Sequence, residues 1–155
     1  MMFNLRQANL QDLETLIQLR LELLREVGNI KTDCDTTKLA QAIRKYLGEK
    51  IPSGEFLAWV AEVDSQIVAT SGLVFFQRPP SNGNLSGIEA YVMNVYTIPM
   101  WRGQGIATAV LKEIITFVKT TEAKRLCLYA TEDGKRLYEK LGLISTTKEM
   151  EIVWH

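Results

Sequence analysis

Histidine is almost missing from this sequence, since the one histidine, His155, is the last residue. Ser-His-Asp triads, Cys-His pairs and most catalytic zinc sites need an internal histidine as base or ligand. The sequence therefore argues against all three classes. The two cysteines, Cys34 and Cys127, are too few for a disulfide framework or a zinc cluster. We expect no metal site, and we interpret Cys127, which lies in an apolar run, as a small strand residue.

Long apolar runs and an excess of one charge are also lacking. No run approaches the ~20 residues of a membrane span, and the N-terminus has no apolar signal-peptide centre. We therefore expect a cytoplasmic protein. The 18 Lys and Arg residues balance the 18 Asp and Glu residues, so neither nucleic acid nor a membrane surface is an expected partner. A length of 155 residues with 46% hydrophobic content predicts one domain over residues 1–155.

The apolar pattern predicts an α/β protein with a mixed sheet. Alternating or β-branched segments predict strands over residues 3–8, 56–63, 67–76, 88–96, 125–131 and 146–154. Apolar residues at helical spacing predict helices over 9–27, from Asp35 or Thr36 to a stop at Gly48, from Ile106 onward, and over 133–141. Asn9 and Asp12 resemble a capping box at the start of the first helix.

The most informative segment is Pro99-Met100-Trp101-Arg102-Gly103-Gln104-Gly105-Ile106-Ala107, which joins a β-rich run to a regular amphipathic helix. Gly103 and Gly105 remove Cβ atoms and permit positive φ where the backbone must curl. The first N–H groups of a helix have no internal partner and lie at the positive end of its dipole. The segment therefore predicts a phosphate site, beside which Arg102 adds a full charge.

Spacing separates this turn from two other phosphate-binding motifs. A P-loop requires Gly-Lys-Ser/Thr after a longer glycine loop, and the turn has neither the lysine nor the length. A dinucleotide fingerprint requires a third glycine, where this chain has Ala107, and an acidic residue after the helix, a role that Glu122 fits weakly. A dinucleotide-binding oxidoreductase stays open as an alternative.

Two segments resemble signatures of the GCN5-related N-acetyltransferase (GNAT) superfamily. Arg102, Gly105 and Ala107 occupy the positions of its Arg-x-x-Gly-x-Ala turn for acetyl-coenzyme A. Tyr138, followed by Glu-Lys-Leu-Gly-Leu, is similar to its C-terminal Tyr-Glu-Lys-x-Gly-Phe stretch. The resemblance implies an acyl-CoA N-acyltransferase fold, with a mixed, mostly antiparallel central sheet flanked by helices. It also implies an acetyl-CoA-dependent transferase that acetylates a primary amine by direct attack in a ternary complex, without a metal, and that forms a homodimer.

The resemblance assigns roles to particular residues. Val95, Tyr96 and Thr97 would offer backbone groups to the pantetheine arm, and an N–H near Val95 would polarise the thioester oxygen. The pyrophosphate would be held by Arg102, Gly103, Gln104, Gly105, Ile106, Ala107 and Thr108. Tyr138 falls on the general-acid position, and a phenol with a pKa near ~10 is suited to protonate a departing thiolate.

The chain departs from the family pattern at three places. Thr131 replaces a common asparagine, and Gly134 replaces an alanine. Where several members carry a glutamate base, this chain has Met93 and Asn94. Glu89 and Glu62 are the alternative candidates for the base, acting through a water chain. The missing glutamate also keeps open a non-catalytic acyl-CoA-binding sensor or interaction domain.

The acceptor is expected to contact the loops over residues 28–35 and 77–87. Asp33 and Asp35 suit an ammonium group of a small polyamine, an aminoglycoside, a lysine or an N-terminal amine. Aspartates in loops also form turns and cap helices, so both interpretations of these two residues stay open. The expected partner is a small-molecule or peptide amine.

Overall fold

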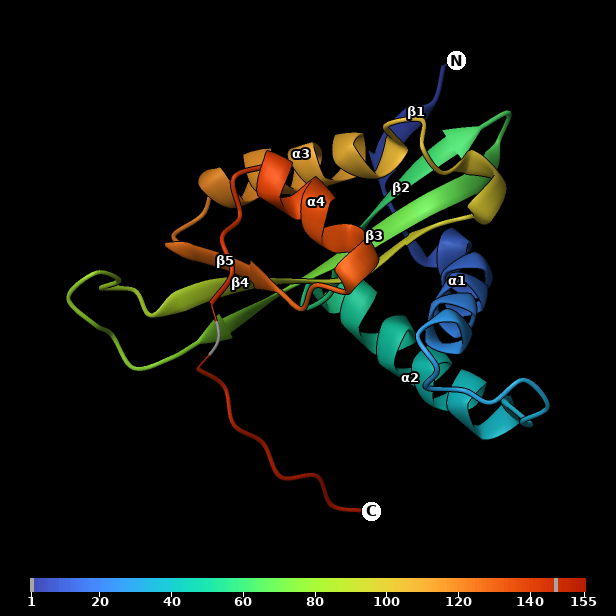
Figure 1. Cartoon of the computed structure of the whole chain (residues 1–155), viewed down its shortest axis with the longest axis horizontal. Coiled ribbons are helices and arrows are strands. Elements are labelled where there is room, and N and C mark those ends of the chain that lie inside the picture. The colour runs from blue at the N-terminus through green and yellow to red at the C-terminus, as the bar shows by residue number, and fades with distance from the viewer. Residues whose placement is uncertain (1, 147) are drawn as a thin grey trace.

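The chain forms a five-stranded sheet with helices on both faces (Figure 1). The computed structural model describes residues 2–146 and 148–155. In chain order the elements are β1 (Asn4–Gln7), η1 (Leu10–Asp12), α1 (Leu13–Glu26), α2 (Thr37–Ser53), β2 (Leu57–Val63), β3 (Gln66–Gln77), β4 (Ile88–Thr97), η2 (Pro99–Trp101), α3 (Ile106–Lys119), β5 (Arg125–Leu128) and α4 (Glu132–Lys140).

The strands, labelled in Figure 1, lie in the order β1-β2-β3-β4-β5, so each strand pairs with its neighbour in sequence. The first three pairings are antiparallel, and β4 and β5 are parallel, joined by the crossover helix α3. The predicted fold class, a mixed and mostly antiparallel sheet flanked by helices, is confirmed. Because only β4 and β5 are parallel, this sheet differs from the all-parallel sheet of a dinucleotide-binding domain.

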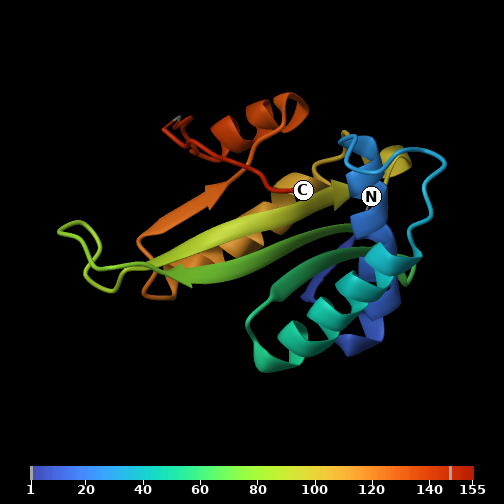
Figure 2. The ribbon, with the colours of Figure 1, turned by 90° about the horizontal axis from the view of Figure 1, so that it is seen from below.

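Both faces of the sheet are buried, which explains the near-continuous apolar run of β2. Ala58 and Val60 belong to the cluster under α1 and α2, whereas Trp59 and Ala61 belong to the cluster under α3 and α4. Figure 2 shows α1 and α2 on one side of the sheet and α4 on the other. The period of two residues along a strand thus divides the core into two layers.

Helix α2 is longer than the sequence predicts. Gly48 lies inside it, and the helix continues to Ser53 and ends at Gly54, whose φ is +77°. A glycine within a helix costs about 1 kcal/mol relative to alanine. Leu47 and Ile51, on either side of Gly48, pack into the cluster shared with α1, and burying such side chains outweighs that cost.

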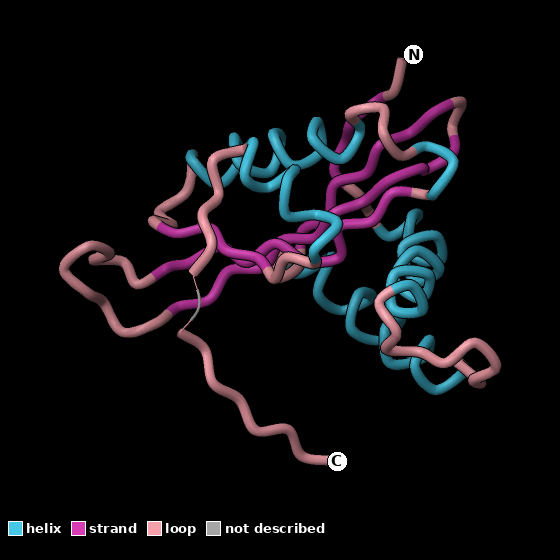
Figure 3. Tube along the Cα trace, viewed as in Figure 1, coloured by secondary structure: helices cyan, strands magenta, loops and turns pink. Residues whose placement is uncertain are grey.

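The predictions for the C-terminal part were wrong in two respects. The strand expected over residues 125–131 ends at Leu128, because β4 diverges from β5 beyond that point. The strand expected over residues 146–154 does not form at Thr146 or over residues 148–154, while Thr147 lies outside the described residues. Within the described part, this segment runs as exposed coil, since it has no neighbouring strand with which to pair (Figure 3).

Candidate functional site

The outer edge of β4 is open over its second half. β5 pairs with Glu89–Val92 only, although β4 continues to Thr97. Among the described residues, no strand covers the β5 side of the backbone from Met93 to Thr97. Unpaired backbone groups at a sheet edge can bind an extended ligand as an added strand would. Val95, Tyr96 and Thr97 lie on this open stretch.

A β-bulge lies at the start of the open edge. Gly72 of β3 pairs with Met93 and Thr70 pairs with Tyr96, so Asn94 and Val95 together oppose one residue, Ser71. Asn94 has a φ of +56°, a conformation that asparagine tolerates better than most residues. A bulge disrupts the ladder and redirects backbone groups, so it is a suitable place for a ligand to approach. The buried hydroxyl of Ser71 has no hydrogen-bond partner among the described residues.

The glycine turn follows at the end of β4. Gly103 and Gly105 have φ values of +74° and +81°, so both need the freedom of glycine, and Gly105 is the N-cap of α3. A Cβ at either position would meet nothing within 4 Å, which leaves the space beside the turn open. No side chain caps the helix, and the first helical N–H to bond the backbone is that of Ala109, to Gly105.

Among the described residues, the N–H groups of residues 103–108 therefore have no hydrogen-bond partner, and they lie at the positive end of α3. An unpartnered helix start beside an open glycine turn binds phosphate groups well. Ile106 is 1% exposed, so its side chain anchors the helix start in the core while its backbone faces outward. Local sequence and packing thus cooperate to hold this site in shape.

Arg102 connects the turn to the end of α1. Its Nη1 and Nη2 atoms donate to the Glu26 carboxylate over 2.6 and 2.8 Å, and its Nε donates to the Thr97 carbonyl over 2.8 Å. The guanidinium also lies 5.4 Å from the centre of the Tyr96 ring. The bond to Arg102 lowers the pKa of Glu26. In this structure the charge of Arg102 is therefore paired with Glu26, a partner that the sequence analysis missed.

Tyr138 is buried on α4, in the same apolar cluster as Val92 of β4 and Ile106 of α3. Burial raises the pKa of its phenol, so the hydroxyl stays protonated at neutral pH. A Cβ at Gly134 would lie 2.8 Å from the Tyr138 ring. The ring therefore occupies the space that an alanine would need, which accounts for the glycine at this departure from the family pattern.

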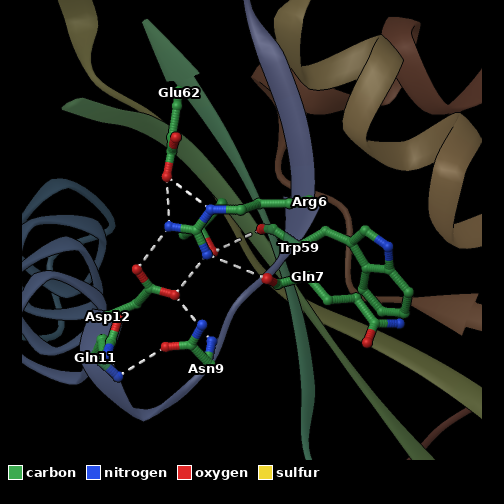
Figure 4. A network of polar contacts seen from close by, with 8 residues as sticks. Arg6, Gln7, Asn9, Gln11, Asp12, Trp59 and Glu62 are labelled. Carbon is green, nitrogen blue, oxygen red and sulfur yellow. Dashed lines mark hydrogen bonds and ion pairs between the residues drawn. The ribbon is translucent and has the colours of Figure 1, made fainter. Parts of the chain in front are cut away.

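The two candidate bases have structural partners. Glu89 lies near the start of β4, about 20 Å along the strand from Val95, and pairs with Arg125 over 2.9 Å and Arg78 over 3.2 Å. Burial opposes ionisation of Glu89, but these two arginines hold its pKa below the usual value. Glu62 of β2 accepts a hydrogen bond from Arg6 of β1, at the edge of the sheet opposite β5 (Figure 4). This geometry favours a structural role for both carboxylates.

The loop aspartates divide between the two interpretations. Asp35 accepts bonds from the N–H and hydroxyl of Thr37 over 2.9 and 2.6 Å, so it forms a turn just before α2, whose N-cap is Thr36. Asp33 is exposed. Within the described ranges, no helix is long and apolar enough to cross a membrane, and no three His, Cys, Asp or Glu side chains gather as metal ligands would.

The comparisons with known proteins agree with this geometry. A model of the acetyltransferase (GNAT) family matches residues 15–143. A crystal structure of a predicted acetyltransferase with acetyl-CoA from Clostridium acetobutylicum is 31% identical, with a TM-score of 0.88, over 98% of this chain and 96% of that chain. A GCN5-related N-acetyltransferase from Ralstonia eutropha is 26% identical, with a TM-score of 0.85, over 98% and 99% of the two chains.

A ribosomal-protein-alanine N-acetyltransferase from Brucella melitensis shares the fold, with a TM-score of 0.74 at 18% identity over 99% and 100% of the two chains. No curated protein is similar enough to match the sequence. The family model covers most of the chain, including the glycine turn and Tyr138. The protein therefore belongs to the acetyltransferase (GNAT) family.

Proposed function

We propose that this protein transfers the acetyl group of acetyl-CoA to the primary amine of a small molecule or peptide. The proposal rests on two features that follow one another in the chain. They are the open edge of β4 and the start of α3, which no side chain caps among the described residues. The structure from Clostridium acetobutylicum, which contains acetyl-CoA, supports the choice of donor. Membership of the family supports the choice of reaction.

The glycine turn would hold the pyrophosphate of coenzyme A. The backbone N–H groups of residues 103–108 would bind the phosphate oxygens, since that of Arg102 already donates to the Pro99 carbonyl. The dipole of α3 would favour the negative charge. The open edge over Val95, Tyr96 and Thr97 would then hold the pantetheine arm like an additional strand. These two features lie next to one another in sequence, so one segment would position the whole donor.

The transfer itself would need only the two substrates and a few protein groups. The amine nitrogen attacks the thioester carbon, a C–N bond forms, and the C–S bond breaks to release coenzyme A thiolate. A backbone N–H at the bulge near Val95 would stabilise the negative oxygen that forms during the attack. The amine would lose a proton to water, and Tyr138 would give its proton to the departing sulfur. The Tyr138 phenolate would then regain a proton from solvent.

A non-catalytic acyl-CoA-binding domain is the second candidate. The observation that favours it is the absence of a glutamate at Met93 and Asn94, together with the ion pairs that occupy Glu89 and Glu62. Such a domain would bind the donor at the same turn and edge and would leave the thioester intact. Both candidates therefore predict that acetyl-CoA binds, but only the transferase predicts the release of free coenzyme A.

The deciding experiment combines calorimetry with a thiol-release assay over a panel of amines, amino acids, peptides and aminoglycosides. We expect acetyl-CoA to bind, NAD to fail to compete, and at least one amine to release free coenzyme A. Binding without thiol release, even at a high pH where amines are uncharged, would favour the non-catalytic domain. A preference for NAD would overturn both candidates.

We also propose that the protein acts in the cytoplasm as a homodimer, assembled through its C-terminal segment. Residues 148–155 are exposed and extended, and Met150, Ile152 and Trp154 alternate along them as the apolar side of a strand does. Figure 1 shows this segment leading away from the sheet. The outer edge of β5 ends the sheet, so a second copy can supply the missing strand.

A further inference from the structure

Arg20 occupies an unusual place on α1. The apolar side of this helix, Leu16, Ile17 and Leu24, packs toward the sheet, and Arg20 lies one turn from each of these residues. Its side chain is therefore half-buried at a position where an apolar residue would ordinarily pack. Burial lowers the pKa of the guanidinium, which reflects the cost of removing its charge from water.

No carboxylate in the described part of the chain forms an ion pair with Arg20. Arginines 6, 25, 44, 78, 102 and 125 each form an ion pair with a carboxylate. Of the two that form none within the described residues, Arg136 is exposed and Arg20 is half-buried. The acidic residues that follow on α1 are already engaged, since Glu22 pairs with Arg25 and Glu26 pairs with Arg102. The Tyr46 phenol on α2 is the other titratable group that acts on Arg20.

The one side-chain partner of Arg20 in the described structure lies at the bulge of β4. The Nη1 atom donates to Oδ1 of Asn94 over 2.5 Å. Arg20 and Asn94 line a small pocket together with Thr70, Gly72 and Phe56, on the side of the sheet covered by α1 and α2. The bulge also begins the open edge proposed to hold the donor, so this pocket adjoins the place where the acetyl group would arrive.

The chemistry of a guanidinium indicates what the pocket would recognise. Its planar N–H groups bind carboxylate and phosphate oxygens in pairs, and one neutral amide oxygen uses only part of this capacity. A half-buried cation with a neutral partner is costly unless a ligand supplies the opposite charge. An anion bound here would remove that cost and would gain a charge-assisted hydrogen bond.

We infer that the acceptor is an amine that also carries an anionic group, a carboxylate or a phosphate, which Arg20 binds at the bulge. This inference rests on the proposed function and adds a substrate class to it. Arg20 is then a specificity-determining residue, which holds the anionic end of the acceptor while the amine faces the thioester.

The test uses matched acceptors that differ in the anionic group alone. An amino acid is compared with its amide, and phosphoethanolamine with ethanolamine, in the thiol-release assay. We expect the anionic member of at least one pair to have a kcat/KM about tenfold higher or more. The pair that shows the preference distinguishes a carboxylate from a phosphate.

The variants Arg20→Met and Arg20→Lys then show whether the preference depends on Arg20. We expect Arg20→Met to remove it, mainly through a higher KM for the anionic acceptor, while the neutral acceptor and the Kd of acetyl-CoA stay unchanged. Arg20→Lys keeps the charge and should restore part of the preference. Arg25→Met is the control: Arg25 lies on the same helix but its charge is paired with Glu22, so the variant should change the turnover of neither acceptor.

Two outcomes would overturn the inference while leaving the proposed function intact. One is equal or faster turnover of the neutral members by the wild-type protein. The other is an equal loss for both members of a pair in Arg20→Met, since that result indicates a structural role in holding Asn94. A failure of acetyl-CoA to bind, or of every amine to react, would instead overturn the proposed function together with this inference.

Discussion

At the scale of single residues, Tyr138 and Gly134 form a matched pair. The phenol ring lies against the backbone of Gly134, one helical turn earlier, and is 9% exposed. A larger residue at position 134 would displace the ring. The glycine that departs from the family pattern thus permits the position that the tyrosine adopts, and the two residues are best regarded as one feature.

The variant Tyr138→Phe tests the acid role. It removes one oxygen atom from a packed ring, so we expect the fold to persist and kcat to fall by about 10²-fold, since general-acid catalysis contributes on that order. The Kd of acetyl-CoA should stay the same. Steady-state kinetics and calorimetry measure the two quantities, with Tyr129→Phe, at a tyrosine that is 82% exposed, as the control. An unchanged kcat would remove Tyr138 from the mechanism.

A second prediction at the scale of residues concerns Asp12 and the stability of the fold at low pH. The Asp12 carboxylate accepts two bonds of 2.8 Å from Arg6 and one of 2.8 Å from the N–H of Asn9, which forms the predicted capping box (Figure 4). The bonds from Arg6 lower the pKa of Asp12, burial opposes this, and the bond from Asn9 lowers it further. The folded state therefore binds a proton less readily than the unfolded chain does.

A carboxyl group with a lowered pKa stabilises the fold above its unfolded pKa of ~3.9 and loses this contribution as the pH falls through the folded value. We expect Asp12→Asn to lower the free energy of unfolding near neutral pH by about 1–3 kcal/mol. Its stability should also depend less on pH below ~4 than that of the wild type. Urea unfolding at several pH values measures both effects, and Asp33→Asn is the control. Parallel pH profiles for Asp12→Asn and the wild type would contradict the assignment.

At the scale of elements, the strand, turn and helix from Ile88 to Lys119 are the best predicted part of the chain. Apolar spacing located β4 and α3, and the positive φ values of Gly103 and Gly105 agree with the predicted curl of the turn. These features depend on residues that are close in sequence. The lengths of α2 and β5 were predicted less well, because packing around Gly48 and the divergence of β4 from β5 decided them.

Two glycine-to-alanine variants should act in opposite directions. Gly105→Ala places a side chain at a φ of +81°, so we expect a loss of about 1–2 kcal/mol in stability and weaker binding of acetyl-CoA. Gly48→Ala lies inside α2, where a Cβ meets nothing within 4 Å, and should stabilise the fold by about 0.5–1 kcal/mol. Thermal unfolding and calorimetry test both variants. Equal acetyl-CoA affinity in Gly105→Ala and the wild type would argue against the turn as the binding site.

At the scale of the whole molecule, neither the outer edge of β5 nor the segment over residues 148–155 pairs with another strand among the described residues. β5 ends the sheet with an open edge, while Met150, Ile152 and Trp154 are 98%, 75% and 82% exposed. Open edges and exposed apolar segments favour association. Because each copy offers both a β5 edge and a C-terminal segment, a two-fold exchange would pair segment with edge twice in a closed dimer.

Removal of residues 148–155 tests this assembly. We expect the full chain to be a dimer by light scattering at micromolar concentration, and the shortened chain to be a monomer that retains the circular dichroism of the folded protein. Ile152→Asp should weaken the dimer, since it places a charge on the apolar side of the segment, whereas Glu151→Gln on the other side should not. A monomeric full chain would contradict the proposed homodimer.

The pattern of residues over short stretches of the sequence determined the family signatures, the strand-turn-helix segment and the two apolar layers of the core. These follow from backbone preferences and apolar spacing over short stretches, which act before distant parts of the chain meet. The tertiary structure alone decided the polar contacts between residues far apart in the sequence. Arg102 joins Glu26 across 76 positions and Arg20 joins Asn94 across 74, because the packing of α1 against the end of β4 brings these side chains together.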